Sequence, residues 1–324
     1  MKKILGFIIL IFTMTSCYDS YVKDYTFDAV YFTYQYDVRT FVVGEGMKFD
    51  YGVGLGGVMT NTKQRIVDYS IDPTLITADV LTAMQASSTT YIKSEMTPVT
   101  AISLLLPTYY TVTDASKFII EKGQNVGRVT IRPDSVAFLS DPKSLIPNYV
   151  LPLVITSADA DSILPTKKTT IIAVKYENKL FGNYYHGGIT IRYTALGVLK
   201  DTLKYYTSIP TTESKIWALK TTAPFELTAN GYSNINGTKQ ELKLILSGSD
   251  ITIGSATGST YTYSDNGASI FNNPKLLQNR KLFLKYKYVD SSGNNCYATD
   301  TLTFRNRIRD GVNEWQDEDP AHYN

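Results

Sequence analysis

Short hydrophobic and polar runs alternate along this chain of 324 residues, and turn residues interrupt them before a helical period can build up. Such runs are typical of β-strands, and the first half predicts strands at 29–36, 47–55, 64–71, 117–120, 127–132, 149–157 and 169–176. We expect a short helix within 73–86 and a polar excursion over a sheet edge at 87–100. This spacing predicts an all-β protein whose first half is a Greek-key, immunoglobulin-like β-sandwich.

The β pattern breaks at 177–184, where we place the boundary between two domains. Asn-Gly and Ser-Gly pairs beyond the boundary are typical of tight hairpin turns. They separate predicted strands at 186–193, 198–206, 215–219, 224–228, 240–246, 250–253, 260–263, 281–289 and 297–304. An antiparallel meander of this length must close or fold over, so a lipocalin-like barrel and a two-sheet sandwich are the alternatives.

The first residues have the pattern of an export signal. Lys2 and Lys3 precede an apolar run at 4–12 that is too short to span a membrane. Small residues then lead to Cys17, in a segment that resembles the lipobox of bacterial lipoproteins. The resemblance implies that Cys17 is acylated and anchors the protein to a membrane. The predicted plan is a signal peptide at 1–16, a tether at 17–24, a sandwich domain at 25–178, a barrel or sandwich domain at 179–309 and an acidic, loosely packed tail at 310–324.

Charge and composition exclude several kinds of site. Residues 1–16 contain two lysines and no acid, so the rest of the chain carries 30 basic and 30 acidic side chains. This balance argues against nucleic-acid binding. Two histidines and two cysteines leave little material for a zinc cluster or a Cys-His catalytic pair, and we expect no metal and no cofactor. With Cys17 acylated, Cys296 has no partner for a disulfide.

The first half contains a set of phrases that resemble a known family. They include Gly56-Gly57-Val58, Ile71-Asp72-Pro73, Leu106-Pro107-Thr108, Gly127-Arg128-Val129 and Tyr149-Val150-Leu151-Pro152. Together they resemble the adhesin-like N-terminal domain of Bacteroidetes surface lipoproteins, a domain of unknown function often encoded beside SusC/SusD-type glycan importers. The segment between Tyr184 and Trp315 resembles the companion C-terminal domain more weakly. Some relatives carry a chitinase-type barrel, but no Asp-x-x-Asp-x-Asp-x-Glu string occurs in this chain, so the resemblance implies a non-catalytic, glycan-binding member.

Carboxylates and histidine offer little for catalysis. Asp159 and Asp161 lie two residues apart on an extended segment, but glycosidases need paired carboxylates that flank a cleft. We therefore expect a turn or weak calcium ligation there. His186 has no histidine partner nearby, and we expect it to be a surface or seam residue.

Tyrosine is unusually frequent, with 25 copies, and its ring and hydroxyl suit sugar recognition as well as β-sheet packing. Alternation predicts that Tyr286 and Tyr288 face the core. Aromatic residues in or beside loops are the candidates for ligand contact, namely Tyr205, Tyr206, Trp217, Tyr232 and Trp315.

These observations predict a lipoprotein of the outer membrane that faces the cell exterior and binds oligosaccharide or polysaccharide for a SusC/SusD-type uptake system. It is expected to be no enzyme, to bind no nucleic acid and to touch the membrane through its lipid anchor alone. The alternative is a structural adhesin or assembly subunit that binds protein partners.

Overall fold

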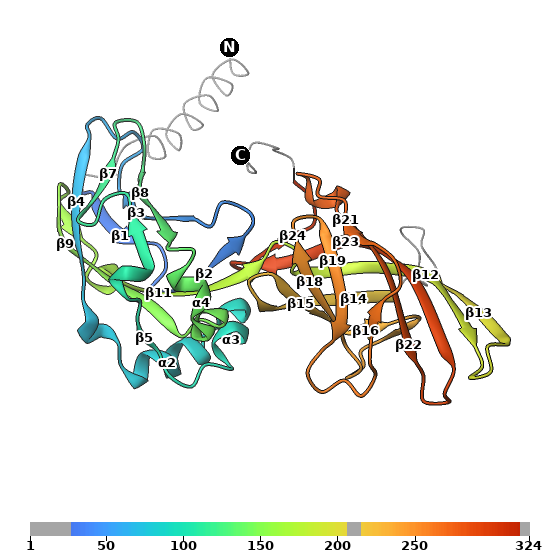
Figure 1. Ribbon diagram of the computed structural model, residues 1–324. Coiled ribbons are helices and arrows are strands. Elements are labelled where there is room, and N and C mark those ends of the chain that lie inside the picture. The colour runs from blue at the N-terminus through green and yellow to red at the C-terminus, as the bar shows by residue number, and fades with distance from the viewer. Residues whose placement is uncertain (1–26, 206–214, 318–324) are drawn as a thin grey trace, which may run out of the picture.

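The computed structural model describes residues 27–205 and 215–317, and within them most of the regular structure is β. Two bodies lie side by side (Figure 1): a sandwich of two sheets formed by residues 29–178, and a curled antiparallel sheet formed by residues 182–314. The predicted all-β fold is confirmed. Among the helices of the described residues, none combines the length and the hydrophobicity that crossing a bilayer requires.

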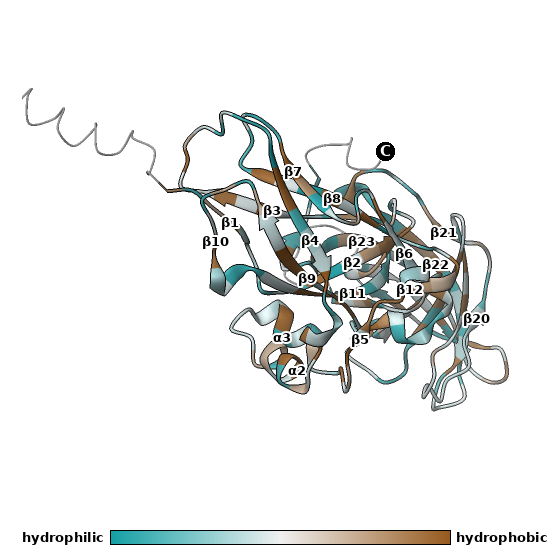
Figure 2. Cartoon of the chain, turned by 90° about the vertical axis from the view of Figure 1, so that its left-hand side faces the viewer, coloured by the Kyte–Doolittle hydropathy of each residue, from teal (hydrophilic) through white to brown (hydrophobic). Residues whose placement is uncertain are grey.

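The sandwich is built from a five-stranded and a six-stranded sheet. The first sheet has the order β10 (Ser162–Ile163), β1 (Ala29–Phe32), β3 (Phe49–Gly56), β8 (Val126–Pro133) and β6 (Tyr110–Val112). The second has the order β2 (Tyr36–Val43), β11 (Thr169–Asn178), β9 (Tyr149–Ala158), β4 (Arg65–Ile71) and β7 (Lys117–Ile120), with β5 (Ser103–Leu104) beside β9. Side chains from both sheets form one core, to which the strongly hydrophobic strand β9 contributes (Figure 2).

Two helices cover the outer face of the second sheet. They are α2 (Ala78–Gln85) and α3 (Thr90–Met96), and the predicted helix within 73–86 is thereby confirmed. Residues 87–100 were expected to form a polar segment without regular structure over a sheet edge, but they contain the helix α3. Its Tyr91, Ile92 and Met96 pack with Val38 and Val150 of the sheet. The remaining helical segments are short: η1 (Pro73–Leu75), η2 (Pro107–Tyr109), α4 (Ala137–Ser140), η3 (Pro142–Leu145), η4 (Pro165–Lys167) and η5 (Leu277–Asn279).

The second body is a closed sheet. Each strand pairs antiparallel with the next, and β12 pairs with both β14 and β23, so a ring of eight strands closes around an interior filled by leucine and aromatic side chains. The ring runs β12 (Gly182–Tyr193), β14 (Lys215–Ala223), β15 (Glu226–Ala229), β18 (Leu242–Ser247), β19 (Asp250–Ser255), β21 (Ser269–Phe271), β22 (Lys281–Val289) and β23 (Asn295–Arg309). Flanking strands are β13 (Leu199–Tyr205), β16 (Gly231–Tyr232), β17 (Ile235–Asn236), β20 (Ser264–Asp265) and β24 (Val312–Glu314). Of the two predicted architectures, the closed barrel therefore describes this body better than the two-sheet sandwich.

Strand β22 illustrates how alternation sets the inner face of the closed sheet. Leu282, Leu284, Tyr286 and Tyr288 are buried, and the residues between them are exposed. The prediction that both tyrosines face the core is confirmed. The expectation of a loosely packed tail from residue 310 is wrong at its start, because β24 pairs with the end of β23.

Candidate functional site

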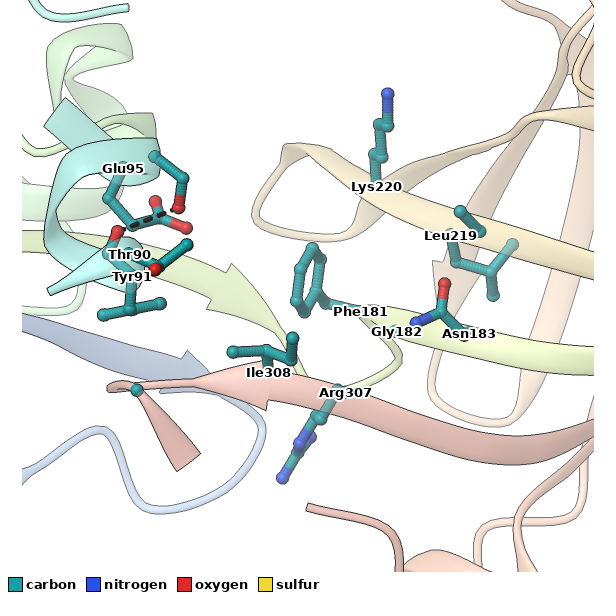
Figure 3. Close-up of a pocket in the computed structure, with 13 residues that line it drawn as sticks. Thr90, Tyr91, Glu95, Phe181, Gly182, Asn183, Leu219, Lys220, Arg307 and Ile308 are labelled. Carbon is teal, nitrogen blue, oxygen red and sulfur yellow. Dashed lines mark hydrogen bonds between the residues drawn. The ribbon is translucent and has the colours of Figure 1, made fainter. Parts of the chain in front are cut away.

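A cleft of about 460 Å³ lies where the sandwich meets the closed sheet (Figure 3). Helix α3 forms one wall, and β14 forms the other through Ala218, Leu219 and Lys220. The segment that connects the two bodies crosses the cleft, since β11 ends at Asn178 and β12 begins at Gly182. The break in the β pattern at 177–184 therefore falls at this cleft.

Phe181 is the aromatic side chain most open to the cleft. Its ring is partly exposed and projects into the space between α3 and β14 (Figure 3). Tyr91 lines the α3 side and is almost fully buried. The ammonium group of Lys175 lies 5.9 Å from the centre of the Phe181 ring, which is within the range of a cation–π contact. The ring therefore has a charged neighbour in Lys175 and is partly exposed to the cleft.

Polar side chains stand on both sides of this ring. Asn183 and Lys220 lie on the closed-sheet side, and Glu95 lies on the α3 side (Figure 3). Ser94 belongs to α3 and also lines the cleft. Lys220 is exposed and has no ion pair within residues 27–205 and 215–317. Glu95 Oε2 accepts a hydrogen bond of 2.5 Å from Lys175 Nζ. An amide, a hydroxyl and charges of both signs can therefore reach a ligand.

A buried charge pair supports the α3 wall. Lys175 Nζ lies 2.7 Å from Glu177 Oε1, so this lysine is shared by Glu177 and Glu95. Burial lowers the pKa of Lys175, but the negative charge of Glu177 and its other neighbours outweighs burial and raises the pKa above its usual value. Burial raises the pKa of Glu177 despite the neighbouring lysine. The lysine therefore stays charged beneath the Phe181 ring.

A second charge cluster connects the two bodies. Glu45, in the β2–β3 turn, receives hydrogen bonds from Arg280, Arg307 and Arg309 of the closed sheet, and Arg307 and Arg309 also bind Glu314. Burial alone would raise the pKa of Glu45, but the charges of Arg307, Arg280 and Arg309 lower it to about 2. Glu45 is therefore ionised throughout the physiological range and ties the sandwich to the closed sheet.

Asp310 makes the junction sensitive to pH. It lines a second cavity of about 380 Å³ with Arg39, Glu45 and Arg309, and its Oδ2 lies 3.8 Å from Nη1 of Arg39. Burial raises the pKa of Asp310 from 3.8 to about 6, against the opposing effect of Arg39. A carboxyl group with a higher pKa in the folded state binds more protons there, so its contribution to stability falls as the pH rises through this window.

The variant Asp310→Asn should therefore lose that part of the pH dependence. Its free energy of unfolding, relative to the parent chain, is expected to rise by about 1–2 kcal/mol between pH 4 and pH 7. Chemical denaturation at a series of pH values measures this difference. A difference between the two chains that stays constant across the window would contradict the assignment.

The described lining of the cleft does not contain a pair of facing carboxyl groups. Glycoside hydrolysis requires two carboxyl groups that flank the scissile bond. Among the described lining residues, Glu95 contributes a carboxylate, and it is engaged by Lys175. In the described part of the chain, no group of three or more His, Cys, Asp or Glu side chains is arranged to hold a metal ion.

A buried polar cluster lies inside the closed sheet. Asp300 accepts hydrogen bonds from the hydroxyls of Tyr205 and Tyr286, and its Oδ2 lies 3.3 Å from His186 Nε2. The expectation that His186 is a surface or seam residue is wrong, because its ring is buried against Trp217 and Tyr205. Gly188 makes room for this carboxylate, since a Cβ there would lie 2.5 Å from Asp300 Oδ1. The cluster lies within the core, where hydrogen bonds to Asp300 connect side chains of β13 and β22.

The predicted ligand contacts do not share one surface. Trp217 is 0% exposed and Tyr232 is 8% exposed, whereas Trp315 is 58% exposed. Tyr205 holds Asp300 through its hydroxyl. Tyr206 and the lipidation candidate Cys17 lie outside the described residues.

Tyr232, predicted as a ligand contact beside a loop, is instead part of the core of the closed sheet. Its ring packs against those of Tyr261, Tyr263 and Tyr288 at centroid distances of 5.3 to 6.0 Å. The neighbouring Ser233 has a positive φ of 49°, and this turn brings the ring inward.

The acids Asp159 and Asp161 lie in a turn, as expected. Asp159 pairs with Lys63, and Asp161 accepts a hydrogen bond from the Asp28 backbone.

No sequence motif marks Phe181 as a ligand contact. The signal was present, because ligand sites occur preferentially at domain interfaces and Phe181 lies within the predicted boundary at 177–184. Residues 177–184 also have the composition of an ordinary connecting segment. Nothing in the sequence indicates that the ring of Phe181 stays partly exposed.

Comparison with known proteins supports the fold. A family model described as an N-terminal domain matches residues 23–162, which lie in the sandwich half of the chain. A solved structure of unknown function from Bacteroides ovatus has a TM-score of 0.64 and 20% sequence identity, and the match covers 91% of this chain and 99% of that chain. This similarity shows that the two share a fold.

Two further Bacteroides ovatus structures are more distant. One, of unknown function, has a TM-score of 0.42 and 13% identity, over 90% of this chain and 100% of that chain. The other, a multidomain protein including DUF1735, has a TM-score of 0.38 and 15% identity, over 87% of this chain and 95% of that chain. No curated protein matches this chain.

Proposed function

We propose that this protein is a non-catalytic, lipid-anchored protein of the outer cell surface that binds oligosaccharide or polysaccharide in the cleft between its two bodies. The observation that carries the proposal is the partly exposed ring of Phe181 inside that cleft, with Asn183, Lys220 and Glu95 around it. An aromatic face packs against the C–H face of a pyranose. The surrounding amide, ammonium and carboxylate groups supply hydrogen bonds to sugar hydroxyls.

The dimensions of the cleft agree with a short glycan segment. Its volume of about 460 Å³ lies within the range usual for small-ligand sites, and it lies at an interface between two bodies, where such sites concentrate. A single partly exposed ring supports weak binding, with a dissociation constant between about 1 μM and 1 mM. Weak binding suits a protein that passes its ligand to a SusC/SusD-type importer, and acylation at Cys17 would hold the protein beside such an importer.

Isothermal titration against plant, mucin and N-linked glycans tests this function. With the glycan that binds, Phe181→Ala is expected to weaken affinity about tenfold, because the stacking face is lost. The matched control is Phe283→Ala, since Phe283 is a partly exposed phenylalanine on the outer face of β22. Its affinity should equal that of the parent chain.

Two results would overturn the proposal. One is the failure of the folded protein to bind any glycan of the panel. The other is binding that Phe181→Ala leaves unchanged, which would place the glycan elsewhere on the molecule.

A further inference from the structure

Three strongly exposed hydrophobic side chains gather at the tip of the β12–β13 hairpin. Leu196 is 92% exposed, Val198 is 62% exposed and Leu199 is 57% exposed. The hairpin extends beyond the closed sheet and projects at the end of the molecule that is remote from the sandwich (Figure 1). Exposed apolar side chains that adjoin one another commonly mark a contact surface.

The backbone of this tip already satisfies several of its own hydrogen bonds. Thr194 N donates to Val198 O at 2.8 Å, and Gly197 N donates to Thr194 O at 2.9 Å. The Thr194 hydroxyl accepts a hydrogen bond of 3.2 Å from Val198 N. Gly197 permits this tight turn because it adopts a φ of 79°. Moving an unpaired backbone N–H or C=O group into an apolar medium costs substantial free energy. Because several of these groups are already paired in this turn, transferring it costs less free energy.

Basic side chains follow the apolar tip. Lys200 and Lys204 are exposed on β13. The nearby Asp201 is engaged by Arg192, whose Nε donates a hydrogen bond of 2.6 Å to it. Asp290, in the adjoining β22–β23 turn, accepts hydrogen bonds from Ser292 and Asn294. Lys200 also interacts with Asp290 and Asp201. Arg192, Lys200 and Lys204 together outnumber these two acids by one, so the flank behind the apolar tip keeps a net positive charge.

We propose that this tip inserts into the interfacial region of a bilayer whose surface is anionic. Leu196, Val198 and Leu199 enter the boundary of the acyl chains, and the lysines contact the headgroup phosphates. The tip residues 195–199 carry no polar side chain and no aromatic ring. Protein interfaces usually use both for specificity, so the composition favours a lipid surface over a protein partner.

The insertion adds an attachment far from the start of the described chain. Strand β1 lies in the sandwich, whereas the tip lies at the opposite end of the molecule (Figure 1). If the acyl group proposed at Cys17 holds the other end, the protein lies along the membrane and the cleft faces parallel to the membrane surface; this orientation rests on the proposed function. This inference does not depend on which ligand the cleft binds.

A tryptophan placed at the tip tests the proposal in the full chain. The variant Leu196→Trp is mixed with phosphatidylcholine vesicles that contain phosphatidylglycerol and a brominated lipid, and the fluorescence of the parent chain is subtracted. We expect a blue shift and quenching by bromine. The matched control is Val136→Trp, because Val136 is a strongly exposed apolar residue of the sandwich, and its tryptophan should not be quenched.

The lysines provide a second measurement. Replacing Lys200 and Lys204 with glutamine is expected to weaken partitioning of the Leu196→Trp tip into the anionic vesicles about fivefold per lysine. Pure phosphatidylcholine vesicles should show no such difference.

Three outcomes would overturn the proposal. They are the absence of quenching at position 196, equal quenching at 136 and 196, and a concentration-dependent blue shift without vesicles, which would assign the tip to a second copy of the chain. If the lysine substitutions change nothing, the requirement for anionic lipid is wrong.

Discussion

Glu45→Ala is expected to lower the free energy of unfolding by about 3–5 kcal/mol, because it removes the buried carboxylate that three arginines share. Arg280 and Arg307 are nearly fully buried, and both bind the Glu45 carboxylate, with Arg309 beside them. The three arginines belong to the closed sheet and Glu45 to the sandwich. We therefore also expect the two bodies to unfold in separate calorimetric transitions in the variant.

The control for this substitution is Glu226→Ala. Glu226 Oε2 lies 3.5 Å from Lys243 Nζ, and both side chains are about one-third exposed. A surface pair of this kind contributes at most about 1 kcal/mol. Equal losses in the two variants would contradict the role assigned to Glu45. Because the pKa of Glu45 is lowered from 4.5 to about 2, the advantage of the parent chain over Glu45→Ala should shrink as the pH falls through that interval.

Trp217→Ala is expected to lower the free energy of unfolding by about 3–5 kcal/mol, as removal of a large buried ring usually does. The ring of Trp217 is stacked on that of His186, with centroids 3.8 Å apart, and it belongs to the core of the closed sheet. The substitution also removes one of the two aromatic faces that enclose His186, and Tyr205 provides the other.

The second tryptophan of the chain provides the comparison. Trp315 is largely exposed, and Trp315→Ala should change stability by less than about 0.5 kcal/mol. Chemical denaturation followed by circular dichroism measures both variants without relying on tryptophan fluorescence. A loss at Trp217 as small as that at Trp315 would show that the ring does not support the core. Glycan affinity of folded Trp217→Ala should match that of the parent chain, which separates a core role from ligand contact.

Local patterns predicted most strands of this protein, but they missed β2 and β21 and placed a strand at 260–263, where the structure has none. In β22 the alternation of lysine with leucine and tyrosine identifies the buried face, because successive side chains of a strand point to opposite sides. Glycine-containing pairs marked hairpin turns, and the interruption at 177–184 marked the passage between the two bodies. These features depend on residues that are close together in the chain.

The helix α3 and the ring of Tyr232 were mispredicted for related reasons. The apolar residues of α3 are outnumbered by polar neighbours, and the helix is stabilised by packing on a sheet whose strands lie elsewhere in the chain. Tyr232 lies among polar loop residues, but the Ser233 turn places it against rings from three other positions. Neither burial follows from nearby sequence.

The chain's own residues thus specify most of its β-strands, their inward and outward faces, many of its turns and the passage between its two halves, because each depends on neighbours a few positions away. The pairing of β12 with β23 closes the second sheet, buries Trp217 and His186, and leaves Phe181 partly exposed in the cleft. Those outcomes depend on contacts between residues more than 100 positions apart, such as Tyr184 with Phe304, and local alternation carries no information about which distant strand will cover a face.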